Sequence, residues 1–158
     1  MRFAVREAGI SDAAAIVALV RRFNVEEGNP PGVLTVEELS RIAFGEQPRF
    51  GALVAESRGD VVGYAVFFRS YDTEHAAKGL YLQDLYIVPE ARGQGIGRAL
   101  MTAVARACLA DEGCYLFWNA RQGNRDGRAF YRAIGAREEP VVTLSLQPDA
   151  LRRLAERG

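Results

Sequence analysis

The chain has 158 residues, of which 49% are apolar and 25% charged, a balance typical of one globular domain. Lys and Arg together number 20, as do Asp and Glu, and this zero net charge argues against a general nucleic-acid surface. Cys108, Cys114 and the single His75 cannot form a zinc set, so no metal is expected and both thiols should be reduced. Because no apolar run could span a membrane and no signal-peptide pattern is present, we expect a cytoplasmic protein.

The first half of the chain carries strand and helix patterns separated by turn residues. Ser11-Asp12 supplies the chemistry of a helix N-cap just before a run of apolar residues at helical spacing. Thr35 followed by Glu38 matches a capping box, which predicts a second, short helix. The expected elements are a strand over 2–7, a helix from Asp12 through Phe23, a helix from Thr35 to Gly45, and a hairpin of strands 51–56 and 61–68.

The second half alternates strand and helix patterns. A polar loop over 71–78 leads to an apolar run that Pro89 ends. An apolar stripe from Ile96 predicts a long helix that opens near Gly95. The expected elements are a strand over 80–88, a helix from Gly95 to Gly113, a buried strand over 114–118, a helix from Asn124 to Ile134 closed by Gly135, a strand over 141–146, and a helix from Pro148 with Leu151 and Leu154 facing inward.

These elements predict the class of the fold. Strands that alternate with helices favour parallel pairing in the second half, whereas the hairpin in the first half favours antiparallel pairing. No repeat or linker divides the chain. We therefore expect an α/β (α+β) fold in which residues 1–158 form a single domain, with a mixed central sheet of about six to seven strands flanked by helices.

The segment Arg92-Gly93-Gln94-Gly95-Ile96-Gly97 joins an apolar strand to a helix, which is the setting of an anion site. A helix N-terminus carries unpaired N–H groups and partial positive charge, and glycines let the backbone approach a phosphate. Arg98 adds positive charge. The glycine spacing does not match the G-x-G-x-x-G of dinucleotide-binding folds, and the Lys-Ser/Thr of a P-loop does not follow Gly97. A phosphate site and a structural tight turn both remain open from these residues alone.

The same segment matches the pattern Arg/Gln-x-x-Gly-x-Gly/Ala at every fixed position, and in this the chain resembles the GNAT family of acetyltransferases. Leu85 to Gly93 resembles the strand that leads into that family's pyrophosphate turn. Asn124 to Ala136 resembles its second signature, Asn…Phe-Tyr…Gly. The resemblance covers nearly the whole chain, and it narrows to the diamine acetyltransferases, which act on spermidine, spermine and lysine-like amines, through the segments 44–48, 53–56, 68–72 and 80–86.

The resemblance implies that the cofactor is acetyl-CoA and that the chain forms a homodimer. It also implies that backbone groups of Leu85 and Ile87 pair with the acetyl carbonyl and the pantetheine arm, and that Tyr131 protonates the departing sulfur. A core aromatic is the alternative for Tyr131, and a plain helix cap is the alternative for Asn124. The residues expected to contact the cofactor are Leu85, Ile87, Arg92, Gly93, Gln94, Gly95, Ile96, Gly97, Arg98, Asn124 and Tyr131.

Gln83 departs from the diamine group, which usually has a glutamate at this position that deprotonates the amine through water. Glutamine cannot act as a base, because its amide does not titrate near neutral pH. Asp84 takes the role in one outcome, although neighbours on a strand point to opposite faces. In a second outcome Tyr131 or a chain of waters suffices for an amine of lower pKa, and in a third the activity is slow or lost. The catalytic candidates are therefore Tyr131, Asp84 and Gln83.

A cationic acceptor amine is expected to bind beside carboxylates. The candidates are Glu26, Glu27, Asp72 and Asp84, and a solvated polar surface is the alternative for each of them. The sequence thus predicts an acetyl-CoA-dependent N-acetyltransferase that acts on a primary amine of a small molecule, namely a polyamine, a diamine or a lysine-like compound. Two alternatives stay open, a protein or peptide N-acetyltransferase and a non-catalytic acyl-CoA-binding module.

Overall fold

The computed structural model describes residues 2–156, and the chain divides into two compact units, Met1–Asn119 and Ala120–Gly158. The first unit is built on one mixed sheet, whose strands are β1 Ala4–Glu7, β2 Gly51–Ser57, β3 Asp60–Asp72, β4 Ala77–Ile87 and β5 Tyr115–Phe117. They lie in the order β1-β2-β3-β4-β5. Neighbours from β1 to β4 are antiparallel and β4 pairs parallel with β5, so both kinds of pairing expected from the sequence are present.

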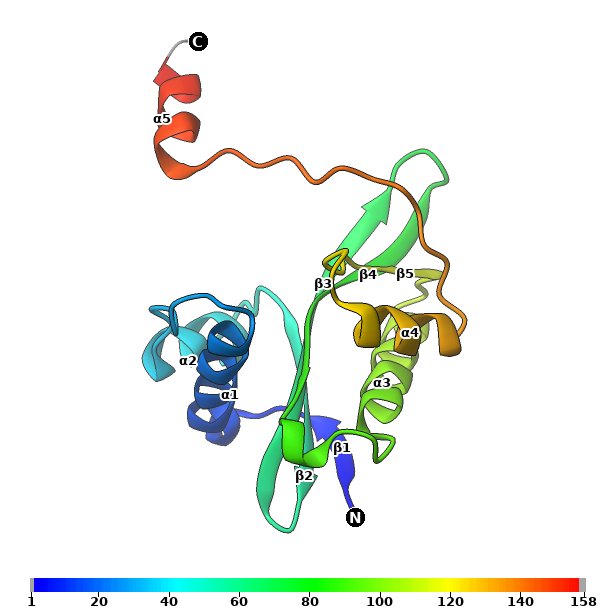
Figure 1. Cartoon of the computed structure of the whole chain (residues 1–158). Coiled ribbons are helices and arrows are strands. Elements are labelled where there is room, and N and C mark those ends of the chain that lie inside the picture. Colours follow the sequence, from blue (N-terminus) through cyan, green and yellow to red (C-terminus); the bar gives the residue numbers. More distant parts are fainter. Residues whose placement is uncertain (1, 157–158) are drawn as a thin grey trace. The chain divides into compact units, whose positions relative to one another are not determined.

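Helices cover both faces of this sheet (Figure 1). On one face α1 (Ala13–Glu26) packs on β3, and α2 (Val36–Phe44) packs on α1. On the other face α3 (Ile96–Ala110) crosses all five strands. Thr35 Oγ1 accepts the N–H of Glu38 at 3.1 Å, as the capping pattern predicts. The largest fully buried side chains come from both helical layers and from the sheet, and they are Ile16, Val54, Tyr64, Ile96, Leu100 and Val104.

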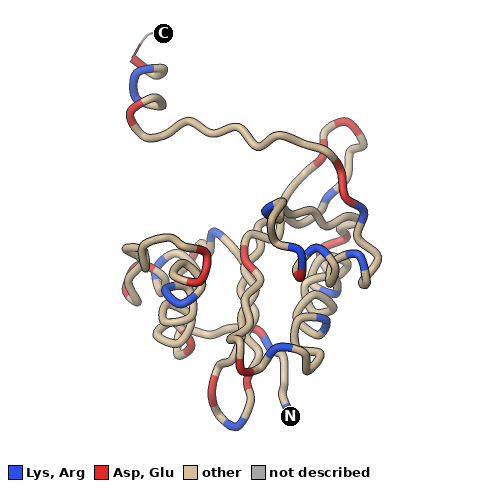
Figure 2. Tube along the Cα trace, viewed as in Figure 1, with Lys and Arg blue, Asp and Glu red and all other residues tan. Residues whose placement is uncertain are grey.

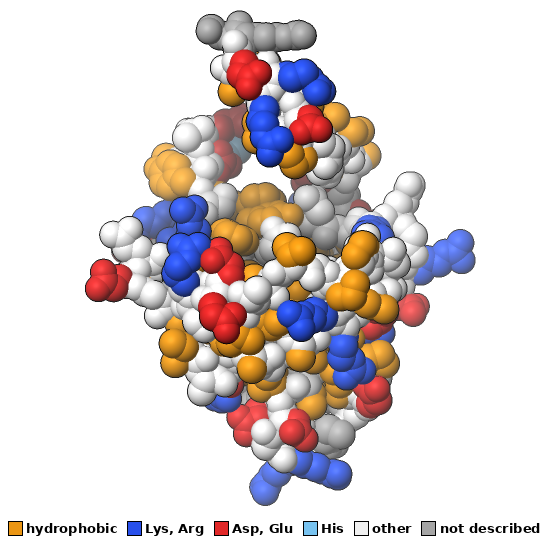
Figure 3. Space-filling view, turned by 90° about the vertical axis from the view of Figure 1, so that its left-hand side faces the viewer, with side chains coloured by type: hydrophobic (Ala, Val, Ile, Leu, Met, Phe, Trp, Pro, Cys, Tyr) orange, Lys and Arg blue, Asp and Glu red, His pale blue; other side chains and the backbone are white. Residues whose placement is uncertain are grey.

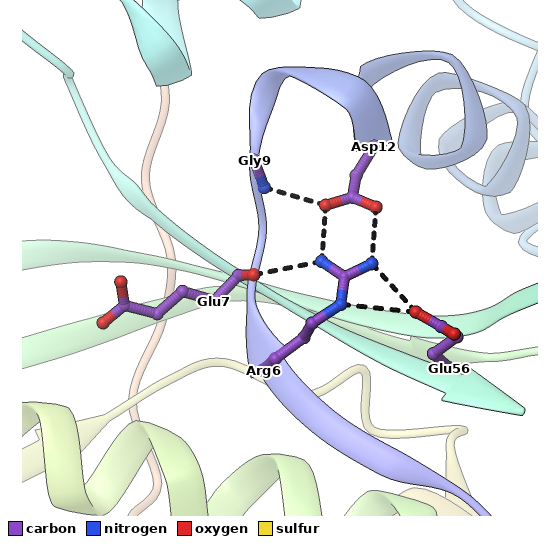
Figure 4. A network of polar contacts seen from close by, with 5 residues as sticks. All are labelled: Arg6, Glu7, Gly9, Asp12 and Glu56. Carbon is purple, nitrogen blue, oxygen red and sulfur yellow. Dashed lines mark hydrogen bonds and ion pairs between the residues drawn. The ribbon is translucent and has the colours of Figure 1, made fainter. Parts of the chain in front are cut away.

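An ion-pair network around Arg6 fixes the start of α1 to the sheet (Figure 4). Arg6 on β1 donates to both carboxylate oxygens of Asp12, at 2.7 and 2.9 Å, and to Glu56 on β2 at 3.0 Å. Gly9 N–H donates to Asp12 Oδ2 at 2.8 Å, whereas the Asp12 side chain makes no capping bond to α1 itself. Asp12 is buried, and these charge-assisted bonds replace its lost hydration. The network therefore holds α1 in place against β1 and β2.

β4 carries a bulge at Gln83. Val66 pairs with Asp84 and Phe67 pairs with Leu82, so Gln83 has no residue opposite it on β3. A bulge bends its strand and re-aims the side chains next to it. The expectation that Gln83 and Asp84 point to opposite faces depends on regular strand geometry, which the bulge interrupts at these two residues.

The hairpin of β3 and β4 is longer than the sequence pattern predicts. Half of the segment 71–78, expected as a polar loop, is paired, with Tyr71 opposite Lys78 and Asp72 opposite Ala77. Strand pairing needs backbone partners rather than apolar side chains, so polar residues can extend a hairpin beyond the core. The expected buried strand over 114–118 is instead a short edge strand, and its Phe117 is 46% exposed.

The second unit contains α4 (Arg125–Ala133) and α5 (Pro148–Glu156). Asn124 Oδ1 accepts the N–H of Gly127 at 2.9 Å, which confirms the predicted N-cap. The backbone of Gly135, with φ of 96°, closes α4 as predicted. The two ends of α4 thus follow from single residues that the sequence displays.

The prediction of a strand over 141–146 is wrong. These residues belong to no strand within the described chain, and Val142 and Leu144 are 83% and 88% exposed. Leu151 and Leu154 of α5 are also exposed, where the sequence pattern predicted an inward orientation. Apolar alternation makes a strand only when a neighbouring strand supplies hydrogen-bond partners. The predicted count of about six to seven strands is therefore wrong as well, because the sheet has five.

Acidic and basic residues are interspersed along the chain, as Figure 2 shows. Within residues 2–156, no helix combines the length and apolar character that crossing a membrane would require. In that same part of the chain, no group of three or more His, Cys, Asp or Glu side chains is arranged to hold a metal ion.

Candidate functional site

The glycine turn, Gly93 to Gly97, connects β4 to α3 through backbone that favours glycine. Gly93 and Gly95 have φ of 73° and 85°, in the left-handed region that side-chain-bearing residues rarely adopt. No atom lies within 4 Å of the position that a Cβ would take at either residue. The turn is therefore an open cradle of backbone, and its shape fits a group that approaches closely.

α3 begins directly at this turn. Gly95 is its N-cap, and Ala99 N–H donates to Gly95 O at 3.0 Å, so the helical hydrogen-bond ladder starts there. N–H groups at the start of a helix point along its axis and attract anions. The side chain of Ile96 is buried, which anchors this helix end in the core and leaves its backbone to face the turn. The glycine turn is thus suited to hold a phosphate group.

β4 presents an open backbone edge beside this turn. β5 pairs with β4 only from Gly79 to Tyr81, and β4 continues to Ile87. Val88 N–H donates to Val62 O of the neighbouring strand segment at 3.0 Å. Because backbone groups alternate along a strand, those of Leu85 and Ile87 point away from β3, toward the side where β5 has ended. An extended ligand could pair with the strand there.

Arg92 directs its guanidinium toward the α1 side of the sheet. Its Nε donates to Ile87 O at 2.9 Å, and its Nη2 lies 2.5 Å from Glu26 Oε1. The guanidinium also lies 5.6 Å from the centre of the Tyr86 ring, in a cation–π arrangement. Arg92 therefore links the backbone of β4 to the end of α1, although the sequence grouped it with the phosphate-binding turn.

The other two polar residues of the turn region lie on its outer side. Gln94 Nε2 donates to Glu90 O at 3.4 Å. Arg98 lines a cavity of about 480 Å³ between β1 and α3, which also reaches Gly95 at the turn and Arg106 further along the helix. The positive charge expected near the turn is thus present on α3.

Asp84 and Gln83 differ in their surroundings. Gln83 is exposed at the bulge, and Asp84 is half-buried. Burial raises the pKa of the Asp84 carboxyl, and the neighbouring Tyr64 hydroxyl opposes that rise. In the register of β3 against β4, Val66 lies opposite Asp84 and Tyr64 lies opposite Tyr86. All four side chains therefore share one face of the sheet. This is the face that α1 covers.

Glu26, at the end of α1, lies on this face within a set of polar contacts. Tyr86 Oη donates to Glu26 Oε2 at 3.0 Å, and Arg92 pairs with the other carboxylate oxygen. We call Glu26, Asp84, Tyr86 and Arg92 the α1-side cluster. A cavity of about 400 Å³ adjoins it, lined by Arg21, Arg22, Val25, Glu26, Pro31, Tyr86 and Pro89.

This cavity carries charges of both signs. Arg22 donates to both carboxylate oxygens of Glu90, at 3.1 and 3.2 Å, and Glu26 is neutralised by Arg92. Figure 3 views the side of the molecule that faces left in Figure 1, and positive and negative side chains there are interspersed among hydrophobic ones. The cavity is therefore not simply an anionic site for cations.

Of the four carboxylates predicted to bind an amine, Glu26 lines this cavity, whereas Asp84, Glu27 and Asp72 do not. Glu27 follows the end of α1 and does not line it. Asp72 ends β3 at the tip of the hairpin, where its carboxylate lies 2.8 Å from His75 Nδ1. This contact with His75 is the main reason that the pKa of Asp72 is lowered. The structure thus brings Glu26 and Asp84 to one face of the sheet and places Asp72 elsewhere.

The second unit holds Asn124, the N-cap of α4, and Tyr131, seven residues further along this helix. Burial raises the pKa of the Tyr131 hydroxyl, which keeps it protonated at neutral pH. Its ring lies 5.2 Å from that of Phe130, so the predicted aromatic pair is present. Glu138 ties α4 to the following segment through Arg128 and Arg132, which lower the pKa of Glu138 to about 2.

Sequence reasoning assigned no role to Tyr64 or Tyr86. Tyr64 sits in an apolar strand and has the pattern of a core aromatic, so only the register with β4 places it beside Asp84. Tyr86 lies two residues after Asp84 and hence on the same strand face, which the sequence could have revealed. The contact of Tyr86 with Glu26 joins segments 60 residues apart and has no local signal.

Comparison with known proteins gives one family. The model of the acetyltransferase (GNAT) family matches residues 15–136, which include the glycine turn, the bulge and α4. A thialysine N-epsilon-acetyltransferase of Mus musculus is 34% identical over 172 residues, which cover 97% of this chain and 97% of that protein. A spermidine/spermine N(1)-acetyltransferase-like protein 1 of Homo sapiens is 28% identical over 85% of this chain and 20% of its own length.

Solved structures show the same fold. An integron cassette protein from the mobile metagenome of V. cholerae superposes with a TM-score of 0.83 at 20% identity, covering 99% of both chains. The curated relatives confirm the predicted likeness to the diamine acetyltransferases. By its family match and by identity over nearly its whole length, the chain belongs to the acetyltransferase (GNAT) family.

Proposed function

We propose that this N-acetyltransferase moves an acetyl group from acetyl-CoA to a primary amine of a small molecule. The observation that carries the proposal is the glycine turn, an open backbone cradle at the N-terminus of α3, beside the free edge of β4. The family match and the relatives named for thialysine and for spermidine and spermine support it.

The glycine turn and β4 together suit the donor. Gly93, Gly95 and the first N–H groups of α3 would hold the pyrophosphate, and positive Arg98 would add attraction. The backbone of Leu85 and Ile87 would pair with the pantetheine arm along the open edge of β4, where Ile87 O also accepts a hydrogen bond from Arg92 Nε. Bound there, acetyl-CoA supplies an activated thioester.

Roles are also proposed for two residues of the second unit. Tyr131 would protonate the departing sulfur, and its burial keeps the hydroxyl in the acid form that this role needs. Asn124 caps α4 and would contact the pantetheine or its surroundings, since one side chain can serve both roles. The family match runs from residue 15 to 136 and so crosses the boundary after Asn119, which supports the proposal that residues 1–158 act as a single domain.

The acceptor is proposed to be a diamine, a polyamine or a lysine-like compound that binds on the α1 side. Asp84 and Glu26 would face its amine. The mixed charge of the adjoining cavity suits an acceptor with an ammonium and a carboxylate, and thialysine, named for the mouse relative, is such a compound. Glu26 lines this cavity, and Asp84 lies on the same strand face as Tyr86, which also lines it. Glu27 and Asp72 are less well placed, because Glu27 does not line the cavity and Asp72 lies at the tip of the hairpin.

An acceptor panel tests the proposal. Purified protein is first titrated with acetyl-CoA by calorimetry, and thiol release is then measured with lysine, thialysine, ornithine, cadaverine, spermidine, an aminoglycoside and a lysine peptide. We expect binding of acetyl-CoA and turnover with small diamines or diamino acids. Binding without turnover on any acceptor would favour a non-catalytic acyl-CoA-binding module, and turnover with the peptide alone would favour a protein acetyltransferase.

We also propose a cytoplasmic homodimer. The free cysteines, Cys108 and Cys114, agree with a reducing compartment. Within the described chain the segment 141–146 belongs to no strand, and its apolar residues Val141, Val142, Leu144 and Leu146 are exposed. A second copy of the chain could supply a neighbouring strand for this segment. Sedimentation at micromolar concentration should give twice the mass of one chain.

A further inference from the structure

The hydroxyl of Tyr64 is buried without a hydrogen-bond partner among the described residues. Tyr64 is 0% exposed, and its Oη has no donor or acceptor in hydrogen-bond geometry. Buried polar groups in folded proteins almost always have a partner, because an unpaired one keeps the full cost of desolvation. This hydroxyl therefore needs a physical explanation.

Asp84 is the neighbour that the Tyr64 hydroxyl faces. Tyr64 pairs with Tyr86 and Val66 pairs with Asp84, so Tyr64 and Asp84 are diagonal neighbours on the same face of β3 and β4. Burial and then the charge of Asp84 raise the pKa of Tyr64, and in return the hydroxyl opposes the burial-driven rise in the pKa of Asp84. The two groups are thus close enough to interact but are not yet aligned for a hydrogen bond.

Other charged groups around this face are already paired. Glu26 from α1 is bound by Arg92 and by Tyr86 Oη, and Arg22 from α1 is bound by Glu90. On α2, which packs against α1, Arg41 pairs with Glu38. Beside burial, Tyr64 is the group among the described residues that shifts the pKa of Asp84.

The bulge explains why Asp84 rather than Gln83 is relevant here. Gln83 is the extra residue of the bulge and is exposed, and its amide cannot accept a proton. Asp84 follows it, half-buried, and it titrates. The chain thus keeps a carboxylate beside the bulge, one residue after the position where the diamine group usually has a glutamate that is followed by an aspartate.

We propose that Asp84 is the base that takes a proton from the acceptor ammonium, and that Tyr64 is a positioning residue whose hydroxyl donates a hydrogen bond to the Asp84 carboxylate. This inference rests on the proposed function. The unpaired hydroxyl is then a donor held beside the Asp84 carboxyl, and it bonds to that group when the carboxyl ionises.

The protons balance in this scheme. The acceptor ammonium gives one proton to Asp84, which later passes it to water, and the neutral nitrogen forms the amide bond as the carbon–sulfur bond breaks. The second proton of that nitrogen leaves as the amide forms, and the departing thiolate gains one proton, from Tyr131 or from water. The overall change is one ammonium and one thioester to one amide, one thiol and one released proton.

The scheme predicts a shift with a definite sign. A hydrogen bond to a carboxylate favours its charged form, so loss of the Tyr64 hydroxyl raises the pKa of Asp84 further. A base works only when ionised, so the rise of kcat/KM with pH moves to higher pH in Tyr64→Phe. If Tyr64 were only structural, Tyr64→Phe would leave the pH profile of kcat/KM where it is. Removal of an unpaired buried hydroxyl would then leave the stability of the fold unchanged or improve it.

The test compares Tyr64→Phe with Tyr71→Phe, which removes an exposed hydroxyl from the same strand. We expect Tyr64→Phe to lower kcat/KM about tenfold at neutral pH and to move its acidic limb upward by about one pH unit, with acetyl-CoA affinity and thermal stability unchanged. Tyr71→Phe should change none of these. Asp84→Asn should lower kcat/KM about 100-fold, and adding Tyr64→Phe to it should cost no more.

A second measurement keeps this inference separate from the proposed function. Carboxyl-carbon NMR follows the titration of Asp84 in the whole protein without any acceptor, and its midpoint should rise in Tyr64→Phe but not in Tyr71→Phe. An unchanged midpoint, or full additivity of Tyr64→Phe with Asp84→Asn, would overturn the role of Tyr64. A raised midpoint in a protein that acetylates nothing would instead contradict the proposed function and leave the pairing of Tyr64 with Asp84 intact.

Discussion

The glycine turn and the α1-side cluster are built in different ways. The turn from Gly93 to Gly97 is made of backbone, and its shape depends on two left-handed glycines at the start of α3. The α1-side cluster is made of side chains from distant parts of the chain, with Glu26 of α1 bound to Tyr86 of β4 and to Arg92 beyond it.

This difference explains how each region can vary. A phosphate presents the same charge and size in every donor, so a fixed backbone cradle serves all of them. Acceptor amines differ in length and charge, and a side-chain network can change one residue at a time. Gln83 of β4 lies next to Asp84 of this network, and the resemblance to the diamine acetyltransferases leads one to expect a glutamate there.

Gly95→Asp should have the largest effect, because it breaks the cradle in two ways. An aspartate would be strained at φ of 85°, and its carboxylate would lie in the open space where the pyrophosphate is proposed to bind. Like charges at such a contact cost several kcal/mol, so acetyl-CoA affinity should fall about 100-fold or more by calorimetry.

Gly59→Asp is the matched control for that change. Gly59 in the β2–β3 turn has φ of 90° and also has no atom within 4 Å of its Cβ position. The Gly59→Asp substitution therefore imposes the same backbone strain and adds the same charge as Gly95→Asp, and it should leave acetyl-CoA affinity unchanged. Equal losses in the two variants would show that strain alone weakens binding and would remove the support for a phosphate site at Gly95.

Tyr131→Phe should separate donor binding from chemistry. The phenol is the proposed acid for the departing sulfur, and general acid catalysis contributes about 100-fold or more to a rate. We expect kcat to fall by that order while calorimetric affinity for acetyl-CoA stays within about twofold, since the glycine turn is untouched. A kcat that does not change would return Tyr131 to the status of a core aromatic packed against Phe130.

Glu26→Gln should have a smaller effect that is confined to the acceptor. The Glu26 carboxylate neutralises the Arg92 guanidinium. The glutamine amide would not, so the positive charge of Arg92 would repel a cationic amine in the adjoining cavity, where the acceptor is proposed to bind. We expect the acceptor KM to rise about tenfold, with less effect at high salt, while kcat and acetyl-CoA affinity hold. Glu27→Gln removes the same charge one residue away and should change KM far less; equal effects would mean that only net charge matters.

The parts of the fold that sequence predicted are those with a local cause. Gly95, Thr35 and Asn124 each start a helix through their own backbone or side chain, and each was expected where it is found. The two kinds of strand pairing also followed from element order, because a hairpin must be antiparallel and a helical crossover favours a parallel pair.

The parts that sequence did not predict depend on partners far along the chain. The bulge at Gln83 exists only in the register of β4 against β3, so strand alternation alone could not reveal the irregular geometry at Gln83 and Asp84. The strand expected over 141–146 lacks a partner within the described chain, and local pattern cannot supply one. The contacts of Tyr64 and Arg92 were not foreseen for the same reason, since each depends on a neighbour in space.

Asp12→Asn should give the smallest effect, on the stability of the α1 side alone. Asparagine keeps one oxygen for Arg6 or Gly9 but loses the charge, so the free energy of unfolding in urea should fall by about 1 kcal/mol at neutral pH. Because Arg6 lowers the pKa of Asp12, the contribution of its charge is complete above about pH 4 and is lost as the pH falls through the lowered value. The gap between wild type and variant should therefore narrow in acid. Asp60→Asn, at an exposed turn, should show no such gap, and hydrogen exchange should quicken in α1 but not at the start of α3.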